Sequence, residues 1–303
     1  MSARSLVNCL LLAIALCAPA SSVTAQPSDV SSIRTRFAGD QPVVLIAHRA
    51  NGFGFPENSL AGIKAAIDAG IDMIELDVRV SADHVHYLMH DRSLDRTTNV
   101  QARFPDGPPK VPGFGAFAIA DNAILFYKSD EINTLELKAE TSADHAVPTL
   151  EEALKIAKGR ILIDLDVKDY QAEELGKLVR TYGTDNLMVR NPSLDKLKAI
   201  YDATGASPLH SLDQADNKIA RLHELKALFG EDVKAVEISA GLITPDLAIQ
   251  AKQLGIRLWV NGLAKPDRDI EQGDVSTWQR VLGSGARAFQ TDYPLTVKPL
   301  FEK

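Results

Sequence analysis

The feature that most constrains the fold of this chain is a repeated alternation of strand-like and helix-like segments. It begins with the apolar run Pro42 to His48 and the helical pattern Ser59 to Gly70, and it recurs to the final run AFQTDYP. An apolar run followed by an amphipathic segment is typical of β-α units, whose strands pair in parallel. The chain contains eight such alternations, and eight parallel strands can close into a barrel. We therefore predict an α/β fold of the (β/α)8 TIM-barrel class.

The expected element boundaries come from apolar runs and from residues that begin or end helices. Ser59 can cap the first helix and Gly70 can end it. Further strands are expected at 73–81, 160–168, 186–191, 208–213, 233–240, 256–263 and 288–294, and further helices at 149–159, 171–183, 193–205, 217–230, 245–255 and 278–285. An open doubly wound sheet is the main competing fold. We prefer the barrel because no glycine-rich dinucleotide fingerprint follows the first strand.

The stretch of residues 92–147 interrupts the alternation and is too long for an ordinary connection. Its part 104–115 is dense in proline and glycine, so we expect irregular structure there. In a barrel, the loops that follow strands build the active site, and an insertion there can act as a lid or a specificity element. A surface excursion is the alternative interpretation.

The first 25 residues have the pattern of a secretory signal. One arginine precedes an apolar run from Leu6 to Ala18, and the small residues ending at Ala25 fit a cleavage site. The apolar run is shorter than the roughly 20 residues that a membrane-spanning helix needs. We expect a secreted or periplasmic protein, cleaved near Ala25, with one barrel domain over 26–303 and no membrane span after cleavage.

Composition narrows the possible partners. Cys9 and Cys17 both lie in the signal, so disulfides cannot stabilise the rest of the chain. With 45% hydrophobic residues the chain can bury a large core instead. A formal net charge of −7 and scattered lysines and arginines argue against binding to nucleic acid or to an anionic membrane. An anionic substrate would need local positive charge.

Acidic side chains recur at two-residue spacing on two expected strands. Glu75 and Asp77 lie on the second strand, and Asp164, Asp166 and Lys168 repeat the spacing on the next. Residues two apart on a strand project from the same face. Carboxylates pointing into a barrel would repel one another unless a cation lay between them, and oxygen ligands favour Mg²⁺ or Ca²⁺ over zinc. An exposed polar face is the alternative for the first pair.

Two histidines and two cations complete the expected site. His48 ends the first strand, where barrel side chains converge on the active site. With His90 it would offer two groups that titrate near neutrality, one to accept and one to donate a proton. Arg49 and Lys168 could bind phosphate oxygens. Composition alone would class these histidines as structural.

These residues together resemble a known family. The segment AHRANGFGFPENSLAGIKAAIDAGIDMIELDVRVSADHVHYLMHDRSLDRTTN contains an HR dipeptide, PEN, a spaced E-x-D, HD and LDRTT, in the order and spacing of the glycerophosphodiester phosphodiesterase family. The resemblance continues with VPTLEEAL, with WVN at Trp259 to Asn261 and with the closing GARAFQTDYP. It spans nearly the whole chain after the signal.

The resemblance implies a role for each matching residue. It makes His48 and His90 the acid/base pair, Arg49 and Lys168 the phosphate-binding residues, Glu75, Asp77 and Asp166 the ligands of Mg²⁺ or Ca²⁺, Glu57 the acidic residue of PEN, and Trp259 an aromatic contact to substrate, with core packing as its alternative. The implied reaction splits a small glycerophosphodiester into sn-glycerol 3-phosphate and an alcohol. A neighbouring glycerol hydroxyl would attack first, and water would open the resulting cyclic phosphate.

Three positions depart from the family pattern. Ala50 replaces a glycine, Asp166 replaces a glutamate, and His84 stands at a turn where the family commonly has glycine. The related venom-type phospholipases D also have aspartate at the second position. A phospholipase D-like activity on lysophospholipids and a barrel that binds phosphodiesters without catalysis are therefore the alternative functions.

The remaining candidates carry no motif of their own. His84, His86 and His90 share a strand parity that could suit zinc, but we expect solvated side chains for His84 and His86. We interpret His145, His210 and His223 as surface or packing residues. Asp292, at the end of the last strand, could orient a histidine or cap the following helix, and Arg190 and Glu237 lie near strand ends that could line a pocket.

Overall fold

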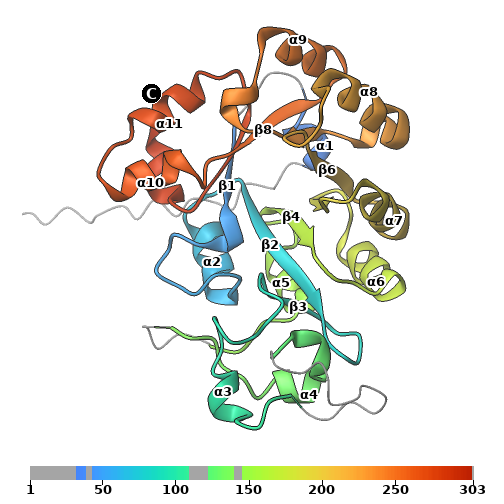
Figure 1. The fold of residues 1–303 in the computed structure, drawn as a ribbon, viewed down its shortest axis with the longest axis vertical. Coiled ribbons are helices and arrows are strands. Elements are labelled where there is room, and N and C mark those ends of the chain that lie inside the picture. Colours follow the sequence, from blue (N-terminus) through green and yellow to red (C-terminus); the bar gives the residue numbers. More distant parts are fainter. Residues whose placement is uncertain (1–31, 39–42, 109–121, 140–144, 302–303) are drawn as a thin grey trace, which may run out of the picture.

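The computed structural model describes residues 32–38, 43–108, 122–139 and 145–301, and within them eight parallel strands close into a barrel (Figure 1). The strands are β1 Val44–Ala47, β2 Met73–Val80, β4 Leu162–Val167, β5 Leu187–Arg190, β6 Ser207–Ser211, β7 Ala235–Glu237, β8 Arg257–Asn261 and β9 Ala288–Thr291. Their order is β1-β9-β8-β7-β6-β5-β4-β2, and β2 pairs with β1 to complete the ring. The barrel prediction is confirmed and the open-sheet alternative is wrong. The predicted signal lies outside the described residues.

Helices follow the strands and surround the barrel. They are α2 Leu60–Asp68, α5 Leu150–Ala157, α6 Ala172–Tyr182, α7 Leu194–Thr204, α8 Lys218–Phe229, α9 Pro245–Gln253, α10 Lys265–Glu271, α11 Ser276–Leu282 and α12 Pro294–Val297, with short 3₁₀ turns η3 Gly230–Asp232, η4 Ala240–Leu242 and η5 Lys298–Leu300. The Ser59 side chain accepts a hydrogen bond from Gly62 N and caps α2, as predicted. Only one helix was expected between β8 and β9, so α10 is an element that the sequence patterns did not reveal.

The insertion after β2 forms a small folded unit of its own. β3 (His86–Leu88) pairs antiparallel with β2, and α3 (Val100–Arg103) and α4 (Ser129–Ile132) lie beyond it at the bottom of Figure 1. The turn η2 (Ile124–Phe126) precedes α4 in the chain. A cluster of buried apolar residues that includes Tyr87, Tyr127 and Ile132 holds these pieces together. The expected irregular stretch 104–115 is described only to residue 108, where it forms turns and bends.

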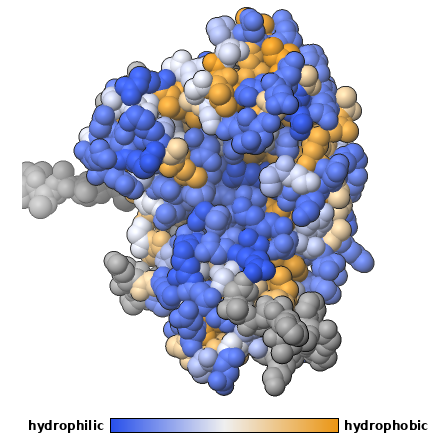
Figure 2. All heavy atoms as spheres, in the orientation of Figure 1, coloured by the Kyte–Doolittle hydropathy of each residue, from blue (hydrophilic) through white to orange (hydrophobic). Residues whose placement is uncertain are grey.

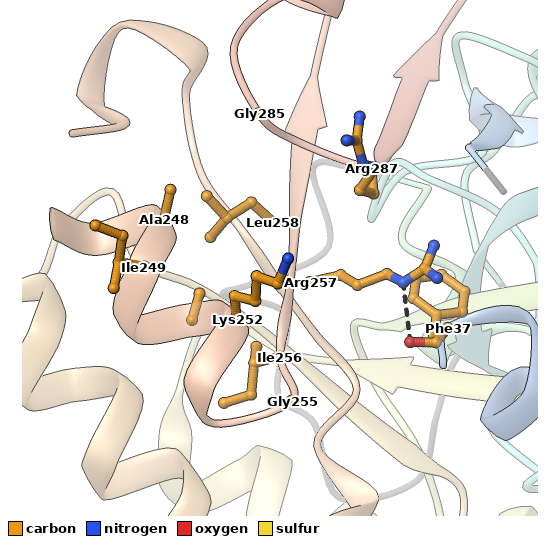
Figure 3. A pocket seen from close by; sticks show the side chains of 11 residues that line it. Phe37, Ala248, Ile249, Lys252, Gly255, Ile256, Arg257, Leu258, Gly285 and Arg287 are labelled. Carbon is orange, nitrogen blue, oxygen red and sulfur yellow. Dashed lines mark hydrogen bonds between the residues drawn. The ribbon is translucent and has the colours of Figure 1, made fainter. Parts of the chain in front are cut away.

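The amino end of the barrel is packed with apolar side chains. Helix α1 (Ile33–Arg36) covers this end, where Phe37 stacks on the buried Trp259 with ring centroids 6.5 Å apart. Arg257, at the start of β8, donates from Nε to the Phe37 carbonyl at 2.9 Å (Figure 3). A cavity of about 480 Å³ lies beside this contact, lined by residues of α9, β8 and the segment before β9. It is therefore at the opposite end of the barrel from the carboxyl ends of the strands.

Polar and apolar residues also lie in different areas of the molecular surface. Figure 2 shows hydrophilic residues across the middle of one face and hydrophobic residues near α8 and α9, where Leu228 and Ile249 are exposed. None of the helices in the described part of the chain is long and apolar enough to cross a membrane.

Candidate active site

His48 lies directly after β1, at the carboxyl end of the barrel. The chain turns sharply there into η1 (His48–Ala50), with positive φ angles of 52° at Arg49 and 50° at Ala50. His48 Nδ1 lies 2.8 Å from Asp292 Oδ1, and Nε2 lies 3.8 Å from Glu75 Oε2. Because an ionised carboxylate only accepts hydrogen bonds, the Asp292 contact places a proton on Nδ1 and leaves Nε2 facing the site. Asp292 thus orients a histidine, and the N-cap position of α12 belongs to Tyr293.

His90 lies on the other side of β2, just after β3, and has the same kind of support. Its Nδ1 is 2.7 Å from Asp91 Oδ1, and its carbonyl accepts a hydrogen bond from Arg79 Nε at 2.9 Å. Arg96 holds Asp91 in turn, with Nε 2.5 Å from Oδ2, and this hydrogen bond lowers the pKa of Asp91 to about 2. The His90 side chain is 36% exposed, compared with 12% for His48. Each histidine therefore keeps Nδ1 against a carboxylate.

Three carboxylates gather between the strand ends. One oxygen each of Glu75, Asp77 and Asp166 lies within 4.8 Å of the others. Strand register explains this, because β2 and β4 pair Asp77 with Asp166 directly. Burial, followed by the neighbouring Asp77, raises the pKa of Glu75 to about 8. Burial would also raise the pKa of Asp77, but nearby donors and cations outweigh it and hold that pKa below its usual value.

Asn58 fixes the Asp77 carboxylate. Its Nδ2 donates to Asp77 Oδ2 at 2.9 Å, and its Oδ1 accepts from the Asp77 backbone N–H at 3.0 Å. Asn58 has a positive φ of 57° and is buried. Sequence reasoning assigned it no role, although the PEN motif contains it.

Two cations border the acidic cluster. Lys168 Nζ lies 3.2 Å from Asp77 Oδ1 and 2.5 Å from Asp166 Oδ2. Arg49 Nε lies 3.3 Å from Asp77 Oδ2, and Arg49 Nη1 lies 3.2 Å from Glu57. Arg96 also binds Glu57, with Nη2 2.6 Å from Oε1, so Glu57 links the loop after β1 to the insertion. The positions predicted to bind phosphate thus lie next to the predicted metal ligands.

A charged layer lies beneath this cluster, centred on Arg190 of β5, whose side chain is 13% exposed. Its guanidinium lies 2.7 Å from Glu237, 3.5 Å from Glu75 and 3.1 Å from Gln290 Oε1. Arg190 Nε is 2.8 Å from Asp164 Oδ2, but the contact is an ion pair without an aligned hydrogen bond. Burial raises the pKa of Asp164 to about 8, against the opposing effect of Arg190. Sequence reasoning placed Arg190 and Glu237 near the pocket but could not give these partners.

The acidic cluster fits a divalent cation. Among the described residues, five carboxylates of the charged interior contact three cations, Arg49, Lys168 and Arg190. With all five ionised, two negative charges would remain, which is the charge that one divalent cation would neutralise. Asp166 Oδ1 is buried and has no hydrogen-bond partner among the described residues. An all-oxygen donor set is the kind that Mg²⁺ and Ca²⁺ prefer. Glu75, Asp77 and Asp166 are the residues that would hold such an ion.

Comparison with known proteins places this geometry in a family. The sequence profile of the Glycerophosphoryl diester phosphodiesterase family matches residues 48–296. The chain belongs to this family. The match begins at His48 and runs past Asp292, so it covers the whole site described above.

Related sequences and structures agree with the family assignment. Glycerophosphodiester phosphodiesterase of Caldanaerobacter subterraneus subsp. tengcongensis is 27% identical over 156 residues, which is 48% of this chain and 56% of the relative. Mouse glycerophosphodiester phosphodiesterase 1 is 32% identical over 132 residues, 42% of this chain and 34% of the relative. The matched part is therefore less than two thirds of the length of these relatives.

Solved structures share the fold over most of the chain. A phosphodiesterase of Oleispira antarctica in complex with the product sn-glycerol-3-phosphate superposes with a TM-score of 0.67, at 19% identity, over 89% of this chain and 99% of that one. A glycerophosphodiester phosphodiesterase of Agrobacterium tumefaciens gives a TM-score of 0.65 at 24% identity, over 86% of this chain and 99% of that one. These superpositions show that the chain has the same fold as both structures.

Two sequence-based expectations need correction. Trp259 was expected to contact substrate, but its ring is fully buried in the apolar amino-end layer, so the geometry supports the packing alternative. The stagger between β7 and β8 explains this, because Trp259 lies in the apolar layer although its register partner Glu237 belongs to the charged layer around Arg190. His86 was expected to be solvated, but it is buried and its Nε2 accepts a hydrogen bond from Gln171 N at 3.2 Å.

The alternative zinc site does not form. His84 lies in a turn with a φ of 71° and is exposed, while His86 is buried against the chain beyond β4. Among the described residues, the only cluster suited to a metal is the acidic one. His210 is buried and lies 3.3 Å from the Asn191 carbonyl, which fits the packing role expected for it.

Proposed function

We propose that this chain hydrolyses glycerophosphodiesters to sn-glycerol 3-phosphate and an alcohol by two-histidine acid/base catalysis. The observation that carries the proposal is the matched support of His48 and His90. Each has Nδ1 against a carboxylate, Asp292 or Asp91, which leaves Nε2 available for proton transfer. The Oleispira antarctica relative was solved with sn-glycerol-3-phosphate bound, which supports the same product here.

The reaction needs two proton transfers in each of two steps. In the first, one histidine accepts the proton of the neighbouring glycerol hydroxyl as its oxygen attacks phosphorus, and the other protonates the alcohol oxygen as its P–O bond breaks. The products are an alcohol and a cyclic phosphate. In the second, the histidines exchange roles, so that water attacks phosphorus and the ring oxygen leaves with a proton. The like support of the two imidazoles suits this exchange.

The surrounding charges bind and orient the phosphate. Arg49 and Lys168 lie beside the carboxylate cluster and would contact non-bridging phosphate oxygens. A Mg²⁺ or Ca²⁺ ion held by Glu75, Asp77 and Asp166 would supply Lewis-acid stabilisation of the phosphoryl charge. Asn58 keeps the Asp77 carboxylate fixed for that purpose.

Hydrolysis of glycerophosphocholine tests the proposal. The purified chain should release sn-glycerol 3-phosphate and choline, lose activity after exhaustive treatment with a chelator, and regain it on addition of Mg²⁺ or Ca²⁺. His90→Gln should lose most activity, because the amide cannot transfer a proton. His223→Gln, an exposed histidine on α8, is the matched control and should retain it. Full activity after chelation would exclude the metal role.

The same assay separates the alternative functions. Lysophosphatidylcholine, tested beside glycerophosphocholine, should be the poorer substrate, and a preference for the lipid would favour a phospholipase D-like enzyme. Binding of glycerophosphocholine without any product, with every divalent ion tested, would favour the non-catalytic barrel.

We also propose that the protein is exported and cleaved near Ala25. The family match begins at residue 48, so removal of 1–25 leaves all the site residues in place. Mass spectrometry of the protein recovered from the periplasm or medium should give a mature chain that begins at about Gln26. Recovery of exported protein that still carries Met1 would exclude cleavage.

A further inference from the structure

Asp267 on α10 is a buried carboxylate that the mechanism above does not use. It is 2% exposed and accepts three hydrogen bonds from groups in different parts of the fold. Oδ1 accepts from Trp278 Nε1 at 2.8 Å and from Thr291 Oγ1 at 2.7 Å, and Oδ2 accepts from the Asp292 backbone N–H at 2.8 Å. A buried carboxylate with donors on both oxygens is held in one position.

The element that carries Asp267 is itself fixed against β9. The Asp267 backbone N–H donates to the Gly262 carbonyl at 3.0 Å, and Gly262 N donates to the Gln290 carbonyl at 2.8 Å. A Cβ on Gly262 would lie 2.1 Å from the Trp278 ring, so only glycine allows this close approach. Helices α10 and α11 pack side by side (Figure 1). Trp278 of α11 contacts Phe289 of β9, with ring centroids 6.3 Å apart.

Asp267 is linked to His48 through a single residue. Asp292 donates its backbone N–H to Asp267, and its side-chain Oδ1 lies 2.8 Å from His48 Nδ1. The Asp292 side chain is 35% exposed, and His48 is its one partner among the described contacts. Its direction therefore depends on the position of its own backbone.

The loop that follows His48 also packs against this segment. A Cβ on Gly52 would lie 2.6 Å from the Asp292 carbonyl oxygen and 2.4 Å from Pro294 Cδ. A shift of the Asp292 backbone would therefore move both the partner of His48 and the turn that carries His48.

We propose that Asp267 is a positioning residue for His48, acting through the backbone and side chain of Asp292. The proposal rests on the function proposed above, in which His48 transfers a proton at Nε2. Asp267 holds Asp292, and Asp292 holds the imidazole with its proton on Nδ1. A carboxylate on α10, the helix that follows β8, thus fixes a histidine that follows β1.

Asp267→Asn tests the proposal with little change in volume. Asparagine has one acceptor oxygen and one donor amide group, so it cannot accept from both Trp278 Nε1 and Asp292 N. We expect kcat for glycerophosphocholine to fall by about 10–100-fold, since displacements near 1 Å can cost about 10²-fold. KM and the affinity for Mg²⁺ or Ca²⁺, measured by calorimetry, should change less than about threefold, because no phosphate or metal residue contacts Asp267.

Asp269→Asn is the matched control on the same helix. Its carboxylate binds Thr277 at 2.5 Å and Lys265 at 2.6 Å and has no contact with Asp292 among the described residues. We expect wild-type kcat within about twofold. Equal loss of kcat in both variants would mean that α10 acts as packing only.

A second comparison tests whether Asp267 works through Asp292. Asp292→Asn should lower kcat, and adding Asp267→Asn should lower it little further, because the link is already broken. Losses that multiply in the double variant would overturn the proposal. If Asp267→Asn does not fold, Thr291→Val removes one of its donors more mildly and should reduce kcat in the same direction.

A spectroscopic readout separates this inference from the proposed function. The His48 Nδ1–H proton should give a downfield NMR resonance that is kept in Asp269→Asn and lost or shifted in Asp267→Asn. An unchanged resonance would overturn the positioning role. If the wild-type chain does not turn over glycerophosphocholine, the proposed function fails, whereas the resonance still reports on Asp267.

Discussion

The two ends of the barrel interior are built from the same strands but from opposite kinds of side chain. At the amino end, β1, β2 and β4 contribute Val44, Met73 and Leu162, which pack with Trp259 beneath α1. One step towards the carboxyl end, β2 and β4 contribute Glu75 and Asp164 around Arg190. A change of character within two residues of one strand shows that packing and chemistry are separated along the barrel axis.

The two ends differ in whether they must exclude water. Apolar side chains stabilise the fold only where water is excluded, and α1 excludes it at the amino end. The charged layer costs free energy to bury, and its ion pairs and the proposed metal offset that cost. Substitutions at the two ends should therefore fail in different ways.

The largest expected effect is on chemistry at the carboxyl end. His48→Ala removes a proton-transfer group and should lower kcat by about 10²–10⁴-fold. The free energy of unfolding should change by only about 1 kcal/mol, because one hydrogen bond to Asp292 is lost. Steady-state kinetics and urea unfolding on the same preparation check both numbers. A wild-type rate would remove His48 from the mechanism.

Trp259→Ala should show the reverse pattern at the amino end. Truncating a fully buried tryptophan that stacks on Phe37 should lower the free energy of unfolding by about 3–5 kcal/mol. The rate per folded molecule should stay within about threefold of wild type, because the ring lies below the charged layer. Urea unfolding and active-site titration separate the two quantities. A large rise in KM with unchanged stability would instead restore the substrate-contact role expected from the sequence.

How far sequence reasoning reached depends on whether a feature is local. The two-residue spacing on their strands predicted that Glu75, Asp77 and Asp166 all point into the barrel, because strand alternation is a property of neighbouring residues. Their register across β2 and β4 then followed from the parallel pairing of the barrel. The capping of α2 by Ser59 was predictable for the same reason.

Features that depend on distant packing were not predictable. The layer of Trp259 is set by the stagger of β8, and the burial of His86 is set by Gln171, 85 residues away. The strongest omission is Asp267, whose partners lie on α11 and β9 and whose helix has no marked pattern in the sequence. A motif reveals the residues that touch substrate more readily than those that hold them in place.

His86 lies outside both layers and should make stability sensitive to acid. Burial, followed by the nearby His84, lowers the pKa of His86 to about 4 from 6.5. Between these values the unfolded chain binds more protons than the folded chain, so stability rises with pH across this range. The stabilisation is complete above pH 6.5 and is lost as pH falls towards 4, an effect of up to about 3 kcal/mol.

His86→Gln should flatten that part of the pH profile and keep an acceptor for Gln171 N–H. The difference between variant and wild type isolates His86, because Glu75 and Asp164 titrate in the opposite sense and are common to both proteins. Urea unfolding at several values between pH 4 and 7 measures it. An equal pH slope in both proteins would mean that His86 is not the acid-sensitive group.

The smallest expected effect is at Ala50, the position where the family pattern has glycine. Its φ of 50° lies in the left-handed region, which costs alanine about 1–2 kcal/mol. Ala50→Gly relieves this strain but removes a buried methyl group, worth about 0.8 kcal/mol, and loosens the unfolded chain by about 0.4–1 kcal/mol. These contributions nearly cancel, so the free energy of unfolding should change by less than about 1 kcal/mol.

The kcat of Ala50→Gly should also equal that of the wild type, because α2 packs against this turn and fixes its backbone. A Cβ on Gly62 of α2 would lie 2.5 Å from the Ala50 carbonyl oxygen, so the helix packs directly against this turn and fixes His48 whichever residue occupies position 50. Kinetics with glycerophosphocholine measure the outcome. A rise in kcat of tenfold or more in Ala50→Gly would show that the methyl group strains the carboxyl end of the barrel. Alanine in place of the family's glycine would then lower the reaction rate and not the stability.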